Sequence, residues 1–595
     1  AAIGPELDPA RAAEVREAQG QWLLPGLLDI HTHLDLEVEL DPRLPEVLRH
    51  GTTTVVMSNC SLGLAFGAQL RNGENPIVDC FARVENVPKS VLQKVVDQVD
   101  WQDSAGYLSH LATLPLGPNV VPMIPHSMLR AEVMGLAGSV ARAPNAQELQ
   151  QMEALLEQGM RQGYVGFSTD ALPFHYLAND PHRRVKIPTQ FASFAELKRL
   201  TNVVRAHDRV WQATPPKDSR LQTLRQFLLT SGRLFGKPLK ITAVAALDVV
   251  SNRSIGRMAI VLTRLLNSAL LRGRFRLQAL AAPFRVYADG MLTPLAEETP
   301  ALRELNEPDL EDRAARMALL NDAAYVQRFR KAWYQDKRGF GLDRLKRALG
   351  LMDDTLRRDL ADMRMTAQPV PAWDGQTLEQ VYGRYQAWVA GASAQPEDVP
   401  VFEALGPDLG DDCDFFLGLL KHFDTDLRWS VLAANDRPEV VQKLLFDEQI
   451  LPGFNDSGAH LSNMAFYDAN LRGLQLAQKQ GLDQVARHVR RLSAEPADFF
   501  GIDAGRIAIG RRADLLLLDP TALAAYDSEA GTRLQHREAF GHVQMVNRSD
   551  GVVAGVYISG QLAWDGQDFT AVLGQQALGA PLLAGVAAPT PAQLS

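Results

Sequence analysis

The sequence predicts an α/β protein: a (β/α)8 barrel of the TIM type, with a small β-sandwich domain and a helical insertion. Eight short apolar runs recur along the chain, and helical patterns separate most of them. Strands that are apolar throughout are typical of a parallel sheet covered by helices on both faces, and eight strand–helix units make a TIM barrel. No Gly-x-Gly-x-x-Gly turn follows the first run, so an open nucleotide-binding sheet has no support.

The barrel strands are placed by the apolar runs, most of which end in small or polar residues. They are residues 22–33, 52–61, 120–127, 164–170, 209–217, 239–248, 276–284 and 450–460. Helical patterns, such as those over residues 145–163 and 193–208, lie between most neighbouring runs. We therefore expect the barrel to span residues 22–495.

A helical insertion is expected within the barrel, after the seventh strand. Residues from about 295 to 400 carry charged helical patterns and little strand signal. This stretch breaks the alternation of strands and helices, so we interpret it as a lid or subdomain added to the barrel. Its charged positions are typical of solvated helical faces.

The small β domain is expected to draw on both ends of the chain. The runs 505–520 and 551–566 are strand-like and are separated by glycine and aspartate turns, so we assign residues 496–570 to its C-terminal part. Residues 1–21 are interpreted as its N-terminal part. The tail 571–595 is rich in alanine and proline, and we expect it to be loosely ordered.

The composition limits the partners and the compartment. The net charge is −9 and no basic stripe is interleaved with aromatic residues, so no nucleic-acid partner is expected. No apolar run reaches the ~18 residues of a membrane span and no signal peptide is visible, so we expect no membrane partner. The three cysteines, Cys60, Cys80 and Cys413, are widely spaced. This spacing suits a reducing compartment, so we predict a cytoplasmic protein. We expect its partner to be a small-molecule substrate. The oligomeric state, and what precedes Ala1, stay open.

The carboxyl ends of the predicted strands carry residues that can do chemistry, and active groups of TIM barrels sit at these ends. His31 and His33 end the first apolar run, and residues two apart in a strand point to the same side, so their imidazoles share a face. Cys60 ends the second run, and Asp456 lies in the eighth. Imidazole, thiolate and carboxylate together suit zinc, so these four residues predict a zinc site.

Six further residues near the strand ends are predicted to contact a substrate. They are His126, Arg130, His175, Tyr176, Lys217 and His460. They are selected by position, because each lies at or just after the end of a predicted strand and offers a polar side chain. A structural, hydrogen-bonding role fits His126 equally well.

The segments around these residues resemble those of a known family. The segments are PGLLDIHTHLD, HGTTTVVMSNCS, PHSMLR, GYVGFSTD and NDSGAH at strands one, two, three, four and eight, and GRIAIGRRADLLLLDP in the β domain. They resemble motifs of the amidohydrolase superfamily and, within it, of the N-acyl-D-amino-acid deacylases (D-aminoacylases). The matches run from near the start of the chain almost to residue 566 and leave out the helical insertion.

The resemblance implies a role for each matched residue. His31 and His33 are expected to ligate zinc, Cys60 to be a thiolate ligand, and Asp456 to be both a ligand and the proton shuttle. The implied activity is that of a hydrolase acting on carbon–nitrogen bonds other than peptide bonds. The implied substrate is a linear amide, an N-acyl-D-amino acid, whose carbonyl a bound zinc polarises.

The fifth and sixth strands depart from the family pattern. Each ends in a metal-binding histidine in the family, whereas Thr214 stands in the first position here and Thr242 or Ala243 in the second. We therefore expect one tightly held zinc per chain rather than two. The family lysine that follows the strand-six histidine and helps to hold the substrate carboxylate also has no match.

Two other functions stay open. A cyclic-amide hydrolase of the dihydropyrimidinase kind usually carries a carboxylated lysine at the end of strand four, where this chain has GFSTD. A catalytically impaired binding protein on the same scaffold fits the missing histidines. The presence of His31, His33 and Asp456 together argues against that reading.

Overall fold

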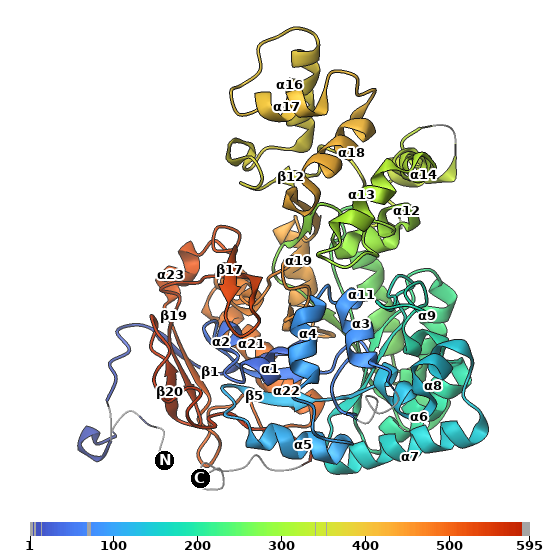
Figure 1. Cartoon of the computed structure of the whole chain (residues 1–595). Helices are drawn as coiled ribbons and strands as arrows, with labels where there is room; N and C mark the ends of the chain where they lie inside the picture. Colours follow the sequence, from blue (N-terminus) through green and yellow to red (C-terminus); the bar gives the residue numbers. More distant parts are fainter. Residues whose placement is uncertain are drawn as a thin grey trace.

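The computed structural model describes residue 4 and residues 7–12, 15–67, 73–338, 341–352 and 354–585. Parts of the predicted segments 1–21 and 571–595 lie outside these described residues. The fold is mixed α/β: helices surround a body of parallel strands, an antiparallel sheet lies at one side, and a largely helical segment rises above (Figure 1).

Each of the eight predicted runs contains at least one strand of the parallel body. One sheet contains, in order, β2 (Leu27–Asp29), β4 (Thr52–Met57) and β5 (Asn119–Pro122). A second sheet contains, in order, β6 (Ile124–Pro125), β7 (Gly166–Asp170), β8 (Val210–Thr214), β9 (Lys240–Ala243), β10 (Arg274–Ala279) and β14 (Ile450–Pro452). A third pairs β3 (His31–Thr32) with β15 (Phe454–Ser457). All these pairings are parallel. Nearly all their residues are buried, as expected for strands covered on both faces.

Three of the predicted strands are each split by a single residue. Ile30 separates β2 from β3, Met123 separates β5 from β6, and Gly453 separates β14 from β15. The Ile30 N–H donates to the Gly453 carbonyl at 2.9 Å, so two of these breaks face each other. Gly453 has a φ of +95°, and a Cβ there would lie 3.1 Å from the Leu28 carbonyl oxygen, so this break suits glycine.

An antiparallel sheet takes the first residues of the predicted strand one. It contains, in order, β1 (Trp22–Pro25), β16 (Leu515–Leu518), β19 (Val553–Ile558) and β20 (Gln561–Trp564). A separate hairpin is formed by β17 (Arg533–Arg537) and β18 (His542–Val546). The prediction that residues 22–33 form one barrel strand is therefore wrong for residues 22–25. The chain passes from the antiparallel sheet to the parallel body at Gly26. A Cβ at Gly26 would lie 2.0 Å from Thr53 Oγ1 on β4, so only glycine lets the chain approach β4 this closely.

Helices flank the parallel strands, and the best predicted of them have clear caps. Up to β14 they are α1 (Glu37–Leu40), α2 (Pro45–Leu48), α3 (Pro76–Val84), α4 (Lys89–Val96), α5 (Ser104–Thr113), α6 (His126–Ala141), α7 (Ala146–Gln162), α8 (Phe194–Ala206), α9 (Arg220–Phe227), α10 (Gly232–Phe235), α11 (Ile255–Leu266) and α19 (Pro438–Leu445); after it come α20 (Ala469–Gln478), α21 (Leu482–Leu492), α22 (Ala494–Phe500) and α23 (Pro520–Ala525). The helix expected over 145–163 is confirmed as α7. Asn145 and Glu148 form its capping box, and Gly163, with a φ of +102°, ends it.

The insertion lies between β10 and β14 and is wider than the predicted 295–400. Strands β11 (Phe284–Asp289) and β13 (Arg428–Ala434) pair antiparallel, and β12 (Arg364–Met365) pairs with β13. Between them lie α12 (Pro300–Arg303), α13 (Arg313–Asn321), α14 (Ala323–Tyr334), α15 (Leu342–Ala348), α16 (Leu378–Val389), α17 (Val399–Leu405) and α18 (Asp412–Phe423). The predicted range 295–400 is mostly helical, but the sequence analysis did not predict the strands β11 and β13 that flank it.

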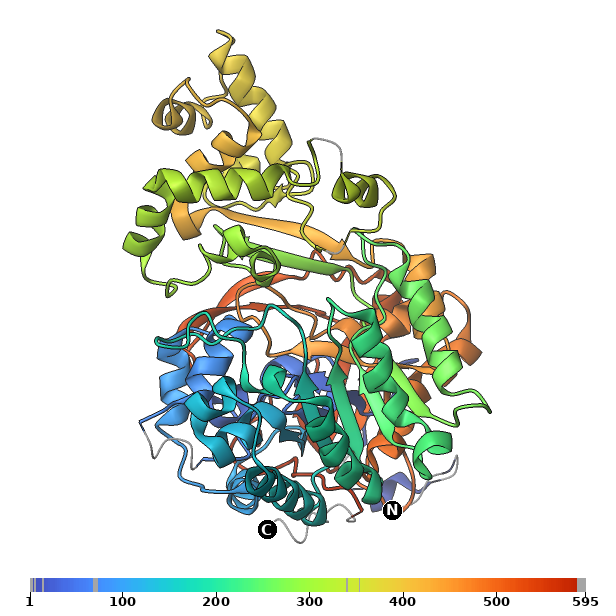
Figure 2. The ribbon, with the colours of Figure 1, turned by 90° about the vertical axis from the view of Figure 1, so that its right-hand side faces the viewer.

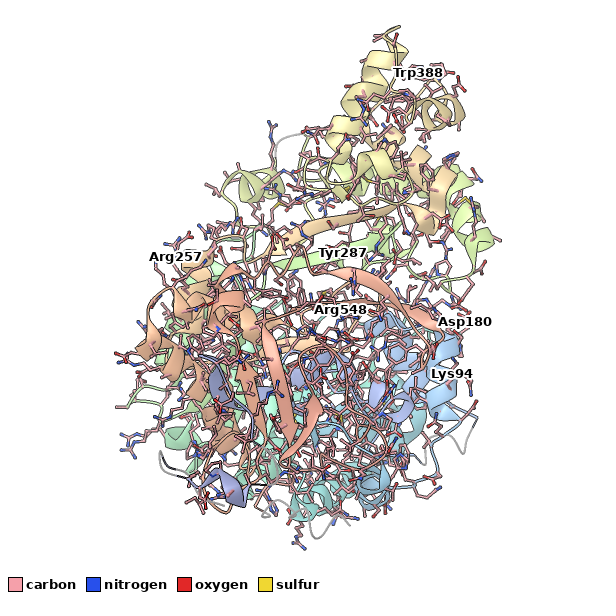
Figure 3. The ribbon with its side chains drawn as sticks, turned by 90° about the vertical axis from the view of Figure 1, so that its left-hand side faces the viewer. Lys94, Asp180, Arg257, Tyr287, Trp388 and Arg548 are labelled. Carbon is pink, nitrogen blue, oxygen red and sulfur yellow. The ribbon has the colours of Figure 1, made fainter. Side chains whose placement is uncertain are left out.

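The insertion has an apolar core of its own, which includes Trp333, Trp373 and Trp429. Figure 2 shows β11 and β13 between the lower body and the upper helices. In Figure 3, Trp388 lies near the outer end of the segment and Tyr287 on β11 at its base. No helix in the described part of the chain is both long and apolar enough to span a membrane.

Candidate metal centre and active site

Two histidines and one cysteine converge where β3 and β4 end. Strand alternation turns His31 and His33 to the same side, and Cys60 follows β4 in a tight turn in which Ser58, Cys60 and Ser61 all have positive φ. The Cys60 Sγ lies 3.3 Å from His31 Nε2. One possible ligand atom from each of the three residues lies within 4.8 Å of the others, and all three are buried. The structure thus brings together the three residues that the sequence placed at these strand ends.

Asp456 on β15 completes the group. Its Oδ1 lies 3.4 Å from His33 Nε2 and 3.7 Å from His31 Nε2. Burial acts to raise the pKa of Asp456, but the neighbouring His33 and His31 outweigh it and hold the pKa below its ordinary value. The carboxylate is therefore charged at neutral pH and faces two imidazoles.

The donor set fits a zinc ion. Two imidazoles, a thiol sulfur and a carboxylate are the ligand types that zinc takes. Burial raises the pKa of the Cys60 thiol to about 11, so a thiolate there requires a cation close by, which a bound metal supplies. His31, His33, Cys60 and Asp456 would hold that ion.

Polar side chains behind the group orient its members. Gln278 on β10 accepts a hydrogen bond from His31 Nδ1 at 2.8 Å, which leaves Nε2 free to bind a cation. Gln212 on β8 accepts from the Cys60 backbone N–H at 2.9 Å. Glu85 lies 3.3 Å from His33 Nδ1. Sequence analysis missed all three, because none ends a predicted strand or belongs to a recognisable motif.

The positions of the two missing histidines are now visible. Thr214, at the end of β8, places its Oγ1 3.3 Å from the Cys60 Sγ. Neither β8 nor β9 contains a histidine. Past the end of β9 the cavity is lined by Val244 and Ala245. Within the described residues, His31, His33 and Cys60 are the only group of three or more such side chains with metal-binding geometry.

A cavity of about 370 Å³ opens over the four residues. Of the predicted substrate contacts, His175, Lys217 and His460 line it. His175 Nδ1 is hydrogen-bonded to the Asp170 carboxylate, and Lys217 Nζ forms an ion pair of 2.7 Å with Glu298. The cavity therefore has a polar floor at the metal centre and an ion pair at its edge.

The other three predicted contacts do not line the cavity. His126 and Arg130 are fully buried and share the Glu196 carboxylate, with Oε1 3.1 Å from His126 Nε2 and 2.5 Å from Arg130 Nη1. The Tyr176 hydroxyl accepts a hydrogen bond from Arg303. These polar atoms are bonded within the protein, and the cavity lining gives no support to the three residues as substrate contacts. Their role as substrate contacts stays a prediction.

No family model matches the sequence. The chain is 34% identical over 581 residues to Uncharacterized protein Rv2913c of Mycobacterium tuberculosis, and the match covers 95% of this chain and 86% of that protein. Two shorter matches are to proteins of Alcaligenes xylosoxydans xylosoxydans. An N-acyl-D-aspartate deacylase is 33% identical over 160 residues, 27% of this chain and 29% of that protein. A D-aminoacylase is 32% identical over 171 residues, 29% of this chain and 32% of that protein.

Solved structures of deacylases share the fold. A D-aminoacylase matches with a TM-score of 0.54 at 19% identity, over 95% of this chain and 90% of that one. An N-acyl-D-glutamate deacylase from Bordetella bronchiseptica, solved with zinc and a phosphonate inhibitor, matches with a TM-score of 0.52 at 18% identity, over 95% and 90%. The resemblance expected from the sequence motifs is thereby confirmed.

Proposed function

Since the chain belongs to the family of the Mycobacterium tuberculosis protein and has the fold of the D-aminoacylases, we propose that it is a metal-dependent hydrolase of a linear amide. The observation that carries the proposal is the meeting of His31, His33, Cys60 and Asp456 on the floor of one cavity. A bound zinc supplies an activated water and polarises the amide carbonyl.

The residues of the chain divide the remaining work. His31 and His33 hold the cation, and Gln278 fixes the His31 ring through Nδ1. Asp456 is the proton carrier: its Oδ1 takes a proton from the attacking water and passes it to the leaving nitrogen. The low pKa of Asp456 suits the first of these steps, because the carboxylate is ready to accept a proton at neutral pH.

We propose one zinc per chain. This proposal rests on Thr214 and on Thr242 or Ala243, which stand in the two positions where the family has histidines. Past the end of β9 the cavity is lined by Val244 and Ala245, which cannot bind a metal. A solved D-aminoacylase is described by one-metal activation and second-metal attenuation of its binuclear centre, so one cation suffices for this chemistry in a protein of the same fold.

We propose N-acyl-D-amino acids as the substrate class, on the strength of the named relatives, which are deacylases of such compounds. His175, Lys217 and His460 are the proposed substrate contacts, because they line the cavity. The cyclic-amide alternative is disfavoured, because β7 (Gly166–Asp170) has the sequence GFSTD and carries no lysine at its end. A cytoplasmic location stays a prediction.

We also propose that the parallel strands form one (β/α)8 barrel, from β2 to the end of the predicted range at residue 495. β1 then belongs with the β-sandwich domain over residues 496–570, because it pairs with β16. The pairings support this proposal. β2 pairs with β4 and β3 pairs with β15, so the strand pieces on either side of Ile30 belong to two neighbouring ladders. β5 and β6, on either side of Met123, link two ladders in the same way.

The test combines metal content with activity. We expect protein purified without added metal to contain close to one zinc per chain by elemental analysis, and to release amino acid from N-acyl-D-amino acids faster than from their L-enantiomers. Two zinc ions per chain would contradict the single-metal proposal. Bound zinc with no hydrolysis of either enantiomer, across several acyl groups, would favour the binding-protein alternative.

A further inference from the structure

We infer that the cavity recognises its amide through a large apolar group and needs no carboxylate on the substrate, so that neutral, lipophilic amides suit it as well as acidic ones. This inference rests on the proposed amide hydrolysis and adds what the site selects for.

The first argument is the wall of the cavity. Above the polar floor it is built from apolar side chains of separate parts of the chain: Val244 and Leu247 after β9, Phe284 and Val286 on β11, Leu295 beyond β11, and Ala433 on β13. Val244, Leu247 and Phe284 are only partly buried. Apolar surface that the protein leaves uncovered inside a cavity is available to an apolar ligand group.

The insertion supplies much of this wall. β11 and β13 pair across the base of the insertion (Figure 2). Val286 on β11 and Ala433 on β13 line the cavity. The same two residues belong to the apolar core of the insertion, and Leu247 packs against that core. Part of the apolar wall is therefore held in place by the core of the insertion.

The second argument is electrostatic. Among the described residues that line the cavity, Lys217 is the only lysine or arginine, and it already faces a carboxylate. Lys217 pairs with Glu298 at 2.7 Å and donates to Thr355 Oγ1 at 3.2 Å. His175 is bonded to Asp170, and His460 Nε2 lies 3.8 Å from a Glu85 oxygen.

A substrate carboxylate would therefore have to displace one of these pairs. The two charges of a bound zinc would not attract it strongly, because the Cys60 thiolate and the Asp456 carboxylate balance them. An apolar group meets no such competition. Each CH₂ that it buries should raise affinity by about fourfold, so a chain longer by several CH₂ groups should gain on the order of 10³-fold.

The experiment measures binding, so that it does not depend on turnover. Sulfonamides of the amide skeleton resist hydrolysis, and two pairs are compared by calorimetry on the zinc-loaded protein: N-octanesulfonyl-D-leucine with its carboxamide, and N-methanesulfonyl-D-leucine with its carboxamide. The octyl group has seven more CH₂ groups than the methyl group, so we expect the octyl compounds to bind on the order of 10⁴-fold more tightly than the methyl compounds. We expect the acid and the carboxamide of each pair to bind within about threefold of each other.

Two leucines provide the matched variants. Leu247 lines the cavity, whereas Leu265 on α11 is 49% exposed and does not line it. Leu247→Asp should lower the affinity for the octyl pair at least tenfold and leave the methyl pair unchanged, and Leu265→Asp should change neither. Leu247→Ala, a milder change, should lower the octyl affinity in the same direction and guards against misfolding of the aspartate variant.

Equal binding of octyl and methyl compounds, no binding of either, or a loss of about tenfold or more on masking the carboxylate, would overturn the inference. Kinetics with the matching N-octanoyl and N-acetyl amides separate this result from the proposed function. Tight octyl binding without any hydrolysis would leave the inference standing and would sink the proposed hydrolase. Hydrolysis of the acids alone, with the carboxamides neither bound nor cleaved, would do the reverse.

Discussion

Replacing Asp456 by asparagine tests the role of the carboxylate most directly. The substitution keeps the size of the side chain but removes a negative charge and the atom that accepts the proton. Asp456 has a φ of +52°, a left-handed conformation that asparagine tolerates as readily as aspartate, so the backbone of β15 should not change. The effect on the fold should therefore be small.

The expected loss of rate follows from the position of Oδ1. This oxygen lies 3.4 Å from His33 Nε2 and 3.7 Å from His31 Nε2, so it stands beside any cation that the two imidazoles hold. Removing one positioned acid–base group typically costs ~10²- to 10⁴-fold in rate, or roughly 3–5 kcal/mol of activation free energy. We expect kcat to fall within that range.

Three measurements on Asp456→Asn read the result: kcat/KM for the best N-acyl substrate, zinc per chain, and the Tm. Lost turnover with zinc retained supports proton transfer by Asp456, whereas loss of zinc and turnover together shows that ligation dominates. Asp468→Asn is the control, because Asp468 is a buried aspartate that accepts a hydrogen bond from Tyr526 and lies outside the metal centre. A variant at 456 that keeps zinc and full turnover would refute the reasoning.

Two further predictions concern metal affinity and pH. Gln278→Ala should weaken zinc binding by about 10- to 100-fold, because the His31 ring loses the acceptor that orients it. Competition with a chelator measures the zinc affinity, and an unchanged affinity would contradict this prediction. Burial lowers the pKa of His488 to about 3 from an ordinary 6.5, so below that ordinary value the unfolded chain binds a proton that the folded chain excludes. The free energy of unfolding should therefore drop by about 2 kcal/mol from this residue between pH 7 and pH 5, and His488→Leu should flatten that part of the pH profile in urea denaturation; an unchanged slope would rule this out.

Local sequence signals were enough for much of the fold. The parallel strands were found because a strand covered on both faces must be apolar along its whole length. The metal residues were found because alternation in a strand puts His31 and His33 on one face whatever the rest of the chain does. Asn145 and Gly163 mark the ends of α7 by their own side-chain chemistry.

The remaining features depend on contacts between distant parts of the chain. β11 and β13 pair although more than a hundred residues separate them in the sequence, and nothing in the sequence of either strand indicates which strand it pairs with. His126 follows a predicted strand, as an active-site residue would, but it turns away to Glu196 on α8. Gln278 matters only because its amide meets His31 from across the sheet. No local pattern contains that information.

The exposure of the four metal-centre residues indicates which of them serves the reaction. Four protein ligands fill the tetrahedral set of a structural zinc site, whereas a catalytic site keeps one position for water or substrate. The His31 and His33 side chains are 1% and 4% exposed, while that of Asp456 is 14% exposed and lines the cavity. All four residues line the cavity, and Asp456 is the most exposed of them, because Cys60 is 8% exposed. With Asp456 free to move a proton, the two imidazoles and Cys60 would still hold the cation, and three is the number of protein ligands in a catalytic zinc site.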